Sequence, residues 1–345
     1  MMNFTEFFLF NNFLFNKEAQ YKKPGRQSGI ALLLSIMIVA LVSIVSVTII
    51  TQRHLQIYRT SNLYFHDQAY QYSLGIERWG LSALSQDFEK DKKENKLFDS
   101  HQDIWNSALV NFDVEQATID GVIFDLQGRF NLNNLVFQGK VQTKWLASYK
   151  RLLDTLDLPP SLASTLVDWL DANELPTGES GAEDIFYIAL EQPYRTANQP
   201  LVHLSELLLI KDYNEDVLNV LKPYVFVAPS GTPVNINTSS VKVLRAIIPD
   251  FSDNQAGTLM TQIEGTPFTT VEDFLKEQLL KNKLIEKNQI SVQSNYFVVN
   301  SRVSINKTKI NLQTLINRNE QGDISIVARQ ESLLYDKVIP NDKSE

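Results

Sequence analysis

The chain contains no cysteine among its 345 residues, so it has no disulfide framework and no thiolate metal site or nucleophile. Histidine is scarce as well. The four histidines are His54, His66, His101 and His203, and none stands in a His-Glu-x-x-His pair. A Walker loop is missing, and Gly-Glu-Ser180-Gly does not match the Gly-x-Ser-x-Gly pattern of serine hydrolases. We therefore expect that the protein is not an enzyme.

Charge is absent from Ile30 to Ile50, which form one apolar run. About 20 apolar residues in a helix span the roughly 30 Å of bilayer hydrocarbon. Lys22, Lys23 and Arg26 precede the run, so the positive-inside rule places the N-terminus in the cytoplasm. A simple signal anchor fits this segment. A cleaved secretory signal fits less well, because the run is long and no small-x-small cleavage site closes it.

The sequence Gly29-Ile-Ala-Leu-Leu-Leu34 stands directly behind these basic residues and resembles a type IV prepilin signal. In that family a peptidase cuts after the glycine, so the resemblance implies a cut between Gly29 and Ile30. Most pilins of this kind carry Glu at the fifth mature position, which pairs with the subunit ahead. This chain has Leu34 there. An unpaired carboxylate in lipid is costly, so Leu34 indicates a subunit at the filament tip, although membrane insertion alone also favours leucine.

The length is enough for two folded units beyond the anchor. Apolar residues at helical spacing predict one helix over 30–84, ended by a charged loop at 87–95. Short runs rich in β-branched and aromatic residues predict strands at 122–126, 296–299, 302–305 and 323–327. The residues 319–323 are typical of a hairpin turn.

Helical patterns fill the stretch between these strands. They predict helices at 141–156, 161–172, 204–209, 215–221, 239–248, 253–263 and 271–276. Phe130-Asn-Leu-Asn and Val234-Asn-Ile-Asn share one pattern, and each precedes two helices separated by an apolar-Pro pair. This weak internal repeat predicts two related helical-hairpin modules.

An acidic loop carries the most concentrated chemistry of the sequence. Neither Lys nor Arg occurs from Leu152 to Tyr194, and the acids there are Asp154, Asp157, Asp168, Asp171, Glu174, Glu179, Glu183, Asp184 and Glu191. A hard cation would offset their repulsion, and calcium takes 6–8 oxygen ligands at about 2.3–2.6 Å. The loop is not an EF-hand, because its sixth and twelfth positions from Asp171 are Pro176 and Ala182. From the residues alone, calcium and a solvated loop of cap and turn carboxylates fit equally well; magnesium fits less well.

Several motifs together resemble the K family of type II secretion pseudopilins. In chain order they are Gly29-Ile-Ala-Leu with Leu34, Asp125-Leu-Gln-Gly-Arg-Phe-Asn-Leu-Asn133, Asp168-Trp-Leu-Asp-Ala-Asn173, Gly181-Ala-Glu-Asp184 with Tyr187, and Thr232-Pro-Val-Asn-Ile-Asn237. The resemblance implies an α+β fold: a long N-terminal helix packed on a small antiparallel, pilin-like sheet, with a large inserted all-α domain. It also implies calcium bound by Asp171, Asn173, Glu183 and Asp184, although the family often has Asp in place of Asn173.

The expected domain organisation follows from these patterns and the resemblance. It comprises a leader (1–29), a transmembrane segment (30–50), a first pilin-like part (51–133), an inserted helical domain (134–288), the C-terminal pilin-like strands (289–335) and a disordered tail (336–345).

The family resemblance also implies a function. It describes a minor pseudopilin at the tip of the pseudopilus that initiates assembly with minor pseudopilins I and J and supports secretion across the outer membrane. The prepilin peptidase and the inner-membrane secretion platform would be further partners. The chain would cross the inner membrane once, with its bulk in the periplasm.

One alternative is a helix-hairpin-helix DNA-binding or DNA-uptake protein anchored in the inner membrane, because the segment from Val234 onward resembles such a module. Its hairpin, Pro249-Asp-Phe-Ser-Asp253, has two acids and no glycine, so it should repel phosphate. The formal net charge of −8 also argues against a general nucleic-acid binder. We therefore expect no nucleic-acid partner.

Overall fold

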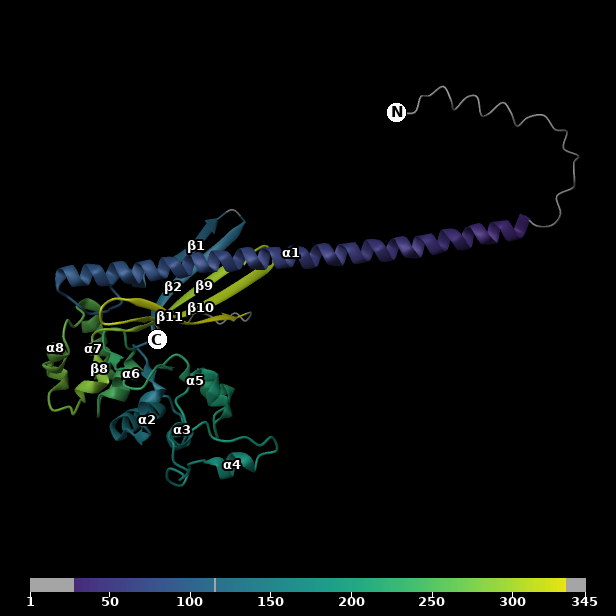
Figure 1. Ribbon diagram of the computed structural model, residues 1–345. Coiled ribbons are helices and arrows are strands. Elements are labelled where there is room, and N and C mark those ends of the chain that lie inside the picture. Colours follow the sequence, from purple (N-terminus) through teal and green to yellow (C-terminus); the bar gives the residue numbers. More distant parts are fainter. Residues whose placement is uncertain (1–27, 115, 333–345) are drawn as a thin grey trace, which may run out of the picture. The chain divides into compact units, whose positions relative to one another are not determined.

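The computed structural model describes residues 28–114 and 116–332, in two compact units that divide after Leu63. The tail predicted at 336–345 and nearly all of the predicted leader lie outside the described residues. A single helix, α1 (Ser28–Glu94), runs through the end of the first unit into the second (Figure 1).

In the first unit, α1 has the length and composition of a membrane span, with a mean hydropathy of 3.0 in its most apolar window. Several of its hydroxyl side chains donate back to helix carbonyls. Ser43 Oγ donates to Val39 O at 2.8 Å, and Thr48 Oγ1 donates to Ile44 O at 2.9 Å. Such bonds satisfy the polar groups within the helix, which lipid requires because it offers no partners.

In the second unit, the later turns of α1 pack on a five-stranded antiparallel sheet (Figure 1). The sheet order is β1 (Leu109–Val114), β2 (Ala117–Asp125), β9 (Tyr296–Ile305), β10 (Thr308–Arg318) and β11 (Ile324–Ser332). Close approach of helix and sheet depends on Gly80, where a Cβ would overlap the Val299 side chain. Ile76, Ala83 and Leu84 fill the rest of this interface. This is the predicted pilin-like arrangement, and it makes the fold α+β.

The loop predicted at 87–95 is wrong, because α1 continues to Glu94. Lys and Glu are good helix formers, so charge alone does not end a helix. Asp87 is buried rather than solvated. The helix ends at Asn95, whose φ of 54° is left-handed, and Lys96 N–H donates to Asp91 O at 2.9 Å. This is a left-handed C-terminal cap.

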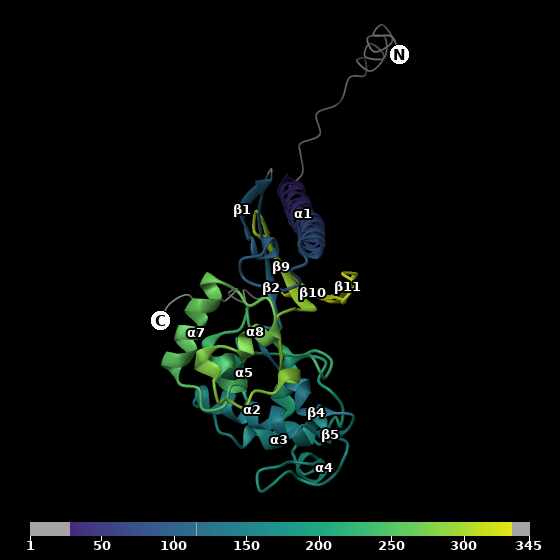
Figure 2. The same cartoon turned by 90° about the vertical axis from the view of Figure 1, so that its left-hand side faces the viewer.

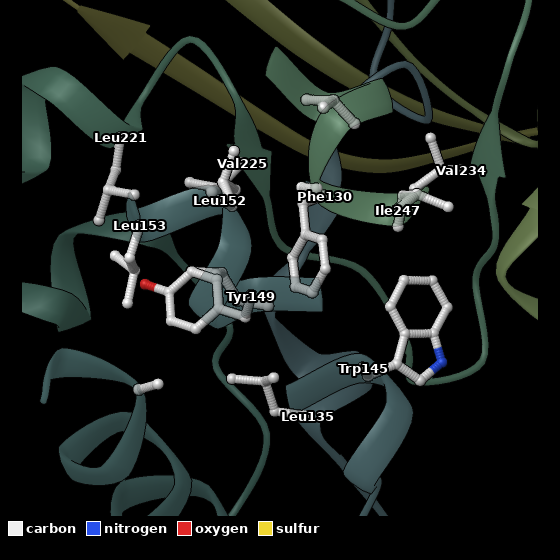
Figure 3. Packing of buried hydrophobic residues seen from close by; sticks show 14 of the residues in the cluster. Phe130, Leu135, Trp145, Tyr149, Leu152, Leu153, Leu221, Val225, Val234 and Ile247 are labelled. Atoms are coloured by element: carbon white, nitrogen blue, oxygen red, sulfur yellow. The ribbon is translucent and has the colours of Figure 1, made fainter. Parts of the chain in front are cut away.

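The segment between β2 and β9 is a mainly helical insertion (Figure 2). Its α-helices are α2 (Thr143–Thr155), α3 (Leu162–Leu170), α4 (Asp184–Ile188), α5 (Glu215–Leu221), α6 (Val241–Ile247), α7 (Asp253–Gly265) and α8 (Val271–Leu275). The insertion also contains the 3₁₀ helix η3 (Leu204–Leu209). The short helix α4, which follows the acidic loop, was not predicted from the sequence. Phe130 lies in the core of this insertion, against Trp145 and Tyr149 at ring-centroid distances of 5.4 and 5.5 Å (Figure 3).

In each half of the insertion, a short strand at the start pairs with a short strand at the end. β3 (Phe130–Asn131) pairs in parallel with β6 (Val225–Phe226), and β7 (Val234–Asn235) pairs in parallel with β8 (Ile290–Ser291). A further antiparallel pair, β4 (Val136–Phe137) and β5 (Lys140–Val141), leads into α2. Each half therefore begins and ends on one two-residue ladder.

In each half, one asparagine of the sequence repeat makes the same pair of hydrogen bonds to the backbone of a single distant residue. Asn133 donates to Leu201 O and accepts from Leu201 N, and Asn237 does the same to Phe268. Each clamped residue stands two positions before a helix cap, His203 in one half and Thr270 in the other. The two halves are thus built alike, as the sequence repeat predicts.

Candidate functional site

The acidic loop joins the end of α3 to the start of α4, and the buried carboxylate of Asp168 shapes it. Asp168 Oδ1 accepts from Thr177 N at 2.9 Å, and Oδ2 accepts from Ala182 N at 2.6 Å. A Cβ on Gly181 would overlap Asp168 Oδ2, so only glycine fits there. Asp168 was not among the predicted ligands. It holds the loop in shape through backbone bonds.

Glu183 is the N-cap residue of α4 and is the unusual group of the loop. Its side chain is 3% exposed, yet neither Oε1 nor Oε2 has a hydrogen-bond partner. Burial, followed by repulsion from Asp168 and Asp171, raises the pKa of Glu183 to about 7. A buried carboxylate without partners is costly to keep charged. Both of its oxygens are therefore free to bind a cation.

Asp171 and Asn173 form a small turn before the loop. Asp171 is buried and accepts from Asn173 N at 3.3 Å and from Asn173 Nδ2 at 2.8 Å. Burial raises the pKa of Asp171. Asn173 is exposed, and its Oδ1 accepts from Leu175 N at 2.8 Å. The structure thus places these two predicted ligands side by side, with Asn173 directing its amide nitrogen at Asp171.

Asp184, the first residue of α4, is held by the segment that follows this helix. Its Oδ1 accepts from Thr196 N at 2.9 Å and from Thr196 Oγ1 at 2.8 Å, and its Oδ2 lies 3.5 Å from Arg195 Nη1. The bonds from Thr196 hold the pKa of Asp184 below its usual range. Asp184 is therefore already engaged, in contrast to Glu183.

The residues fit a hard cation in their chemistry, because they combine hard oxygen donors, excess negative charge and the unpartnered Glu183. They are not drawn into a tight cluster. Among residues 28–114 and 116–332, the only group of at least three acidic or histidine side chains with ligand atoms within 4.8 Å of one another is Asp87, Asp99 and Asp103. A cation in the acidic loop would therefore depend on backbone oxygens or water as well.

The remaining predicted site residues lie at the start of α1. Gly29, Ile30 and Leu34 are all helical and exposed. Leu34 presents an aliphatic surface at the fifth position after the predicted cut.

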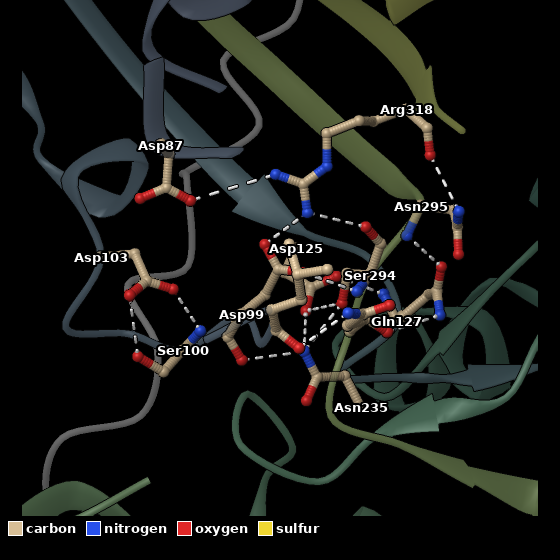
Figure 4. A network of polar contacts seen from close by, with 12 residues as sticks. Asp87, Asp99, Ser100, Asp103, Asp125, Gln127, Asn235, Ser294, Asn295 and Arg318 are labelled. Atoms are coloured by element: carbon tan, nitrogen blue, oxygen red, sulfur yellow. Dashed lines mark hydrogen bonds and ion pairs between the residues drawn. The ribbon is translucent and has the colours of Figure 1, made fainter. Parts of the chain in front are cut away.

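A polar network where the sheet meets the insertion was not predicted (Figure 4). Asp125, at the end of β2, accepts from Ser294 Oγ at 2.6 Å, from Asn235 Nδ2 at 3.3 Å and from Thr238 Oγ1. Gln127 accepts from Asn295 N at 2.6 Å. The sequence signal for it was the motif from Asp125 onward, whose polar residues become buried partners of a distant segment.

Comparison with known proteins places these features in one family. The family model of type II secretion system protein K matches in two parts, at residues 128–230 and 234–293. These parts coincide with the two similar halves of the insertion.

Individual relatives extend the match beyond the insertion. The type II secretion system protein K of Pseudomonas aeruginosa is 32% identical over 88% of this chain and 92% of its own length. That of Pectobacterium carotovorum is 28% identical over 89% of this chain and 97% of its own length. A chain in the crystal structure of the GspK-GspI-GspJ complex of enterotoxigenic Escherichia coli superposes with a TM-score of 0.68 at 27% identity, covering 79% of this chain and 99% of that chain. The protein belongs to the type II secretion system protein K family.

Proposed function

We propose that the protein is the minor pseudopilin at the tip of a type II secretion pseudopilus, where it initiates assembly with minor pseudopilins I and J. The observation that carries this proposal is the fold similarity to a chain solved in a GspK-GspI-GspJ complex. Leu34 supports it, because a subunit with nothing ahead of it has no partner for a carboxylate inside the membrane.

The proposed location is the inner membrane, crossed once, with the second unit in the periplasm. The apolar first part of α1 supports a single span, and the basic residues before it support this orientation. The prepilin peptidase would cut between Gly29 and Ile30, and the inner-membrane platform would receive the mature chain. Through the filament, the protein would support secretion across the outer membrane.

Calcium in the acidic loop is part of the same proposal. Glu183 would offer its two unpartnered oxygens, and Asp171, Asn173 and Asp184 would complete the side-chain donors. The ion would offset the repulsion among the loop carboxylates and tie the end of α3 to the start of α4. Its role would be structural.

Complementation of a strain that lacks this chain tests the proposal. The full chain should restore exoprotein in the medium, and mass spectrometry should find Ile30 at the mature N-terminus. Gly29→Val should block cleavage, whereas the matched control Gly25→Val in the same leader should be processed. Antibody labelling should mark one end of each pseudopilus, and the chain should copurify with subunits I and J. Labelling along the whole filament would contradict a place at the tip.

A further inference from the structure

A second acidic group lies outside the helical insertion, at the end of α1. Asp87 is on the helix, and Asp99 and Asp103 are on the loop that follows it. One carboxylate oxygen from each lies within 4.8 Å of the others (Figure 4). Asp87 and Asp99 are each 2% exposed, and Asp103 is half-buried, which leaves the group open to small ions.

The nearby guanidinium of Arg318, at the end of β10, supplies one positive charge. Its Nη2 lies 2.5 Å from Asp99 Oδ1, and its Nη1 lies 4.0 Å from Asp87 Oδ2. One guanidinium balances one of the three carboxylates. Asp91, one turn beyond Asp87, adds to the repulsion and is accompanied by Lys90. Negative charge therefore remains in excess at a mostly buried place, which costs free energy unless a proton or a cation offsets it.

Two of the three carboxylates are held by hydrogen bonds. Asp99 Oδ2 accepts from Ser294 N at 2.7 Å, and Asp103 accepts from Ser100 N at 2.6 Å and from Ser100 Oγ at 3.3 Å. The third is held less tightly: Asp87 Oδ2 is buried and has no hydrogen-bond partner, and its contact with Arg318 Nη1 is 4.0 Å long. The buried carboxylate of Asp87 thus lies beside two carboxylates that the fold has already oriented, and its Oδ2 faces the guanidinium of Arg318 from 4.0 Å (Figure 4).

We propose that Asp87, Asp99 and Asp103 bind a divalent cation of the calcium class, separate from the acidic loop. Charge supports this, because one divalent ion together with Arg318 would balance the three carboxylates. Size supports it as well: oxygens bound on opposite sides of calcium lie about 5 Å apart, given bonds of about 2.3–2.6 Å, and the three ligand oxygens lie within 4.8 Å. Such an ion would contact the Asp87 carboxylate more closely than Arg318 does, and Asp87 Oδ2 has no hydrogen-bond partner.

The position of the group gives the ion a structural task. Asp99 also binds the insertion through its backbone, since its N–H donates to Val292 O at 2.8 Å and its carbonyl accepts from Asn235 Nδ2 at 3.1 Å. A cation held by Asp99 would therefore connect the end of α1 to the joint between sheet and insertion. Its loss should loosen that joint.

Calcium binding by the full chain in detergent tests the proposal. All variants carry Glu183→Gln, so that binding in the acidic loop is disabled and the result does not depend on that loop. Calcium chloride alone is titrated by calorimetry, and thermal unfolding is followed with and without calcium. The Glu183→Gln chain should bind one calcium ion, and its unfolding midpoint should rise by several degrees. Adding Asp87→Asn should weaken binding at least tenfold, whereas the exposed matched control Glu89→Gln, on the same helix, should leave it unchanged.

Three results would overturn the proposal. The first is that the Glu183→Gln chain does not bind calcium, and the second is that adding Asp87→Asn does not weaken calcium binding. The third is that Asp87→Asn stabilises the chain while calcium has no effect on its unfolding, which would mean that protons offset the charge of the three carboxylates. If Asp87→Asn does not fold, Asp103→Asn on the half-buried side replaces it, with the same expected tenfold loss.

Discussion

Replacing Glu183 by Gln should change stability in opposite directions with and without calcium. At pH 8 the carboxylate, whose pKa is raised to about 7, is charged, buried and unpartnered. A rise from 4.5 to about 7 corresponds to about 3 kcal/mol of destabilisation at 1.36 kcal/mol per pH unit. A buried Gln amide keeps part of that cost, so Glu183→Gln should stabilise the calcium-free chain by about 2 kcal/mol.

With calcium the sign should reverse. Calcium at 100 times its dissociation constant for the acidic loop stabilises the native state by about 2.7 kcal/mol, and the variant loses this part of the calcium effect while it keeps the part that comes from the second site. Glu183→Gln should then be the less stable protein. The assay is urea unfolding of the full chain in detergent, followed by tryptophan fluorescence, in chelator and in calcium. Glu179→Gln, exposed on the same loop, is the matched control and should change little in either condition. A variant that is less stable in chelator, or that gains as much from calcium as the wild type, would refute this reasoning.

Further predictions concern residues other than the proposed cation ligands. Asn237→Ala removes both bonds to one buried backbone unit and should destabilise by about 3 kcal/mol in urea unfolding, and an effect below 1 kcal/mol would contradict a clamping role. Arg329 lowers the pKa of Glu77 through bonds of 2.6 and 2.9 Å, so this pair stabilises the fold above the unfolded pKa of about 4.5 and the contribution disappears as pH falls below it. When unfolding is measured from pH 7 to pH 3, the free energy of unfolding of Glu77→Gln should therefore fall less steeply with pH than that of the wild type. An equally steep fall in both proteins would show that this pair does not contribute to the loss of stability in acid. Gly181→Ala should destabilise by about 2 kcal/mol through overlap with Asp168, and an unchanged thermal midpoint would show that the loop can yield.

The internal repeat shows how far local patterns reach. Its asparagines were visible in the sequence, and their spacing correctly predicted two similar helical halves. Which backbone groups they bind was not visible, because Asn133 reaches Leu201 and Asn237 reaches Phe268 across intervening helices. A pattern recurs locally, whereas a hydrogen-bond partner is chosen by the packed chain.

The sheet was predicted only in part. The two strands predicted at 296–299 and 302–305 form one strand, β9, and neither β1 nor β10 was predicted. β10 carries the alternation expected of a strand, with Ile310, Leu312 and Ile316 buried. Polar residues interrupt the apolar pattern of β10, so its sequence alone predicts a strand only weakly. Pairing with β9 and β11 nevertheless holds this segment in a strand.

By itself the sequence determined the long apolar helix, most of the short helices and the acidic loop, because hydrophobic runs, helical spacing and charge are local properties. Tertiary structure alone decided which acids are buried. Asp87 appeared to belong to a charged loop, yet the extended helix brings it into the protein beside Arg318. Asp99 and Arg318, 219 residues apart, meet only because β10 returns to the end of α1. Burial removes the water that would otherwise screen such charges, and it is this loss that turns ordinary carboxylates into candidate cation ligands.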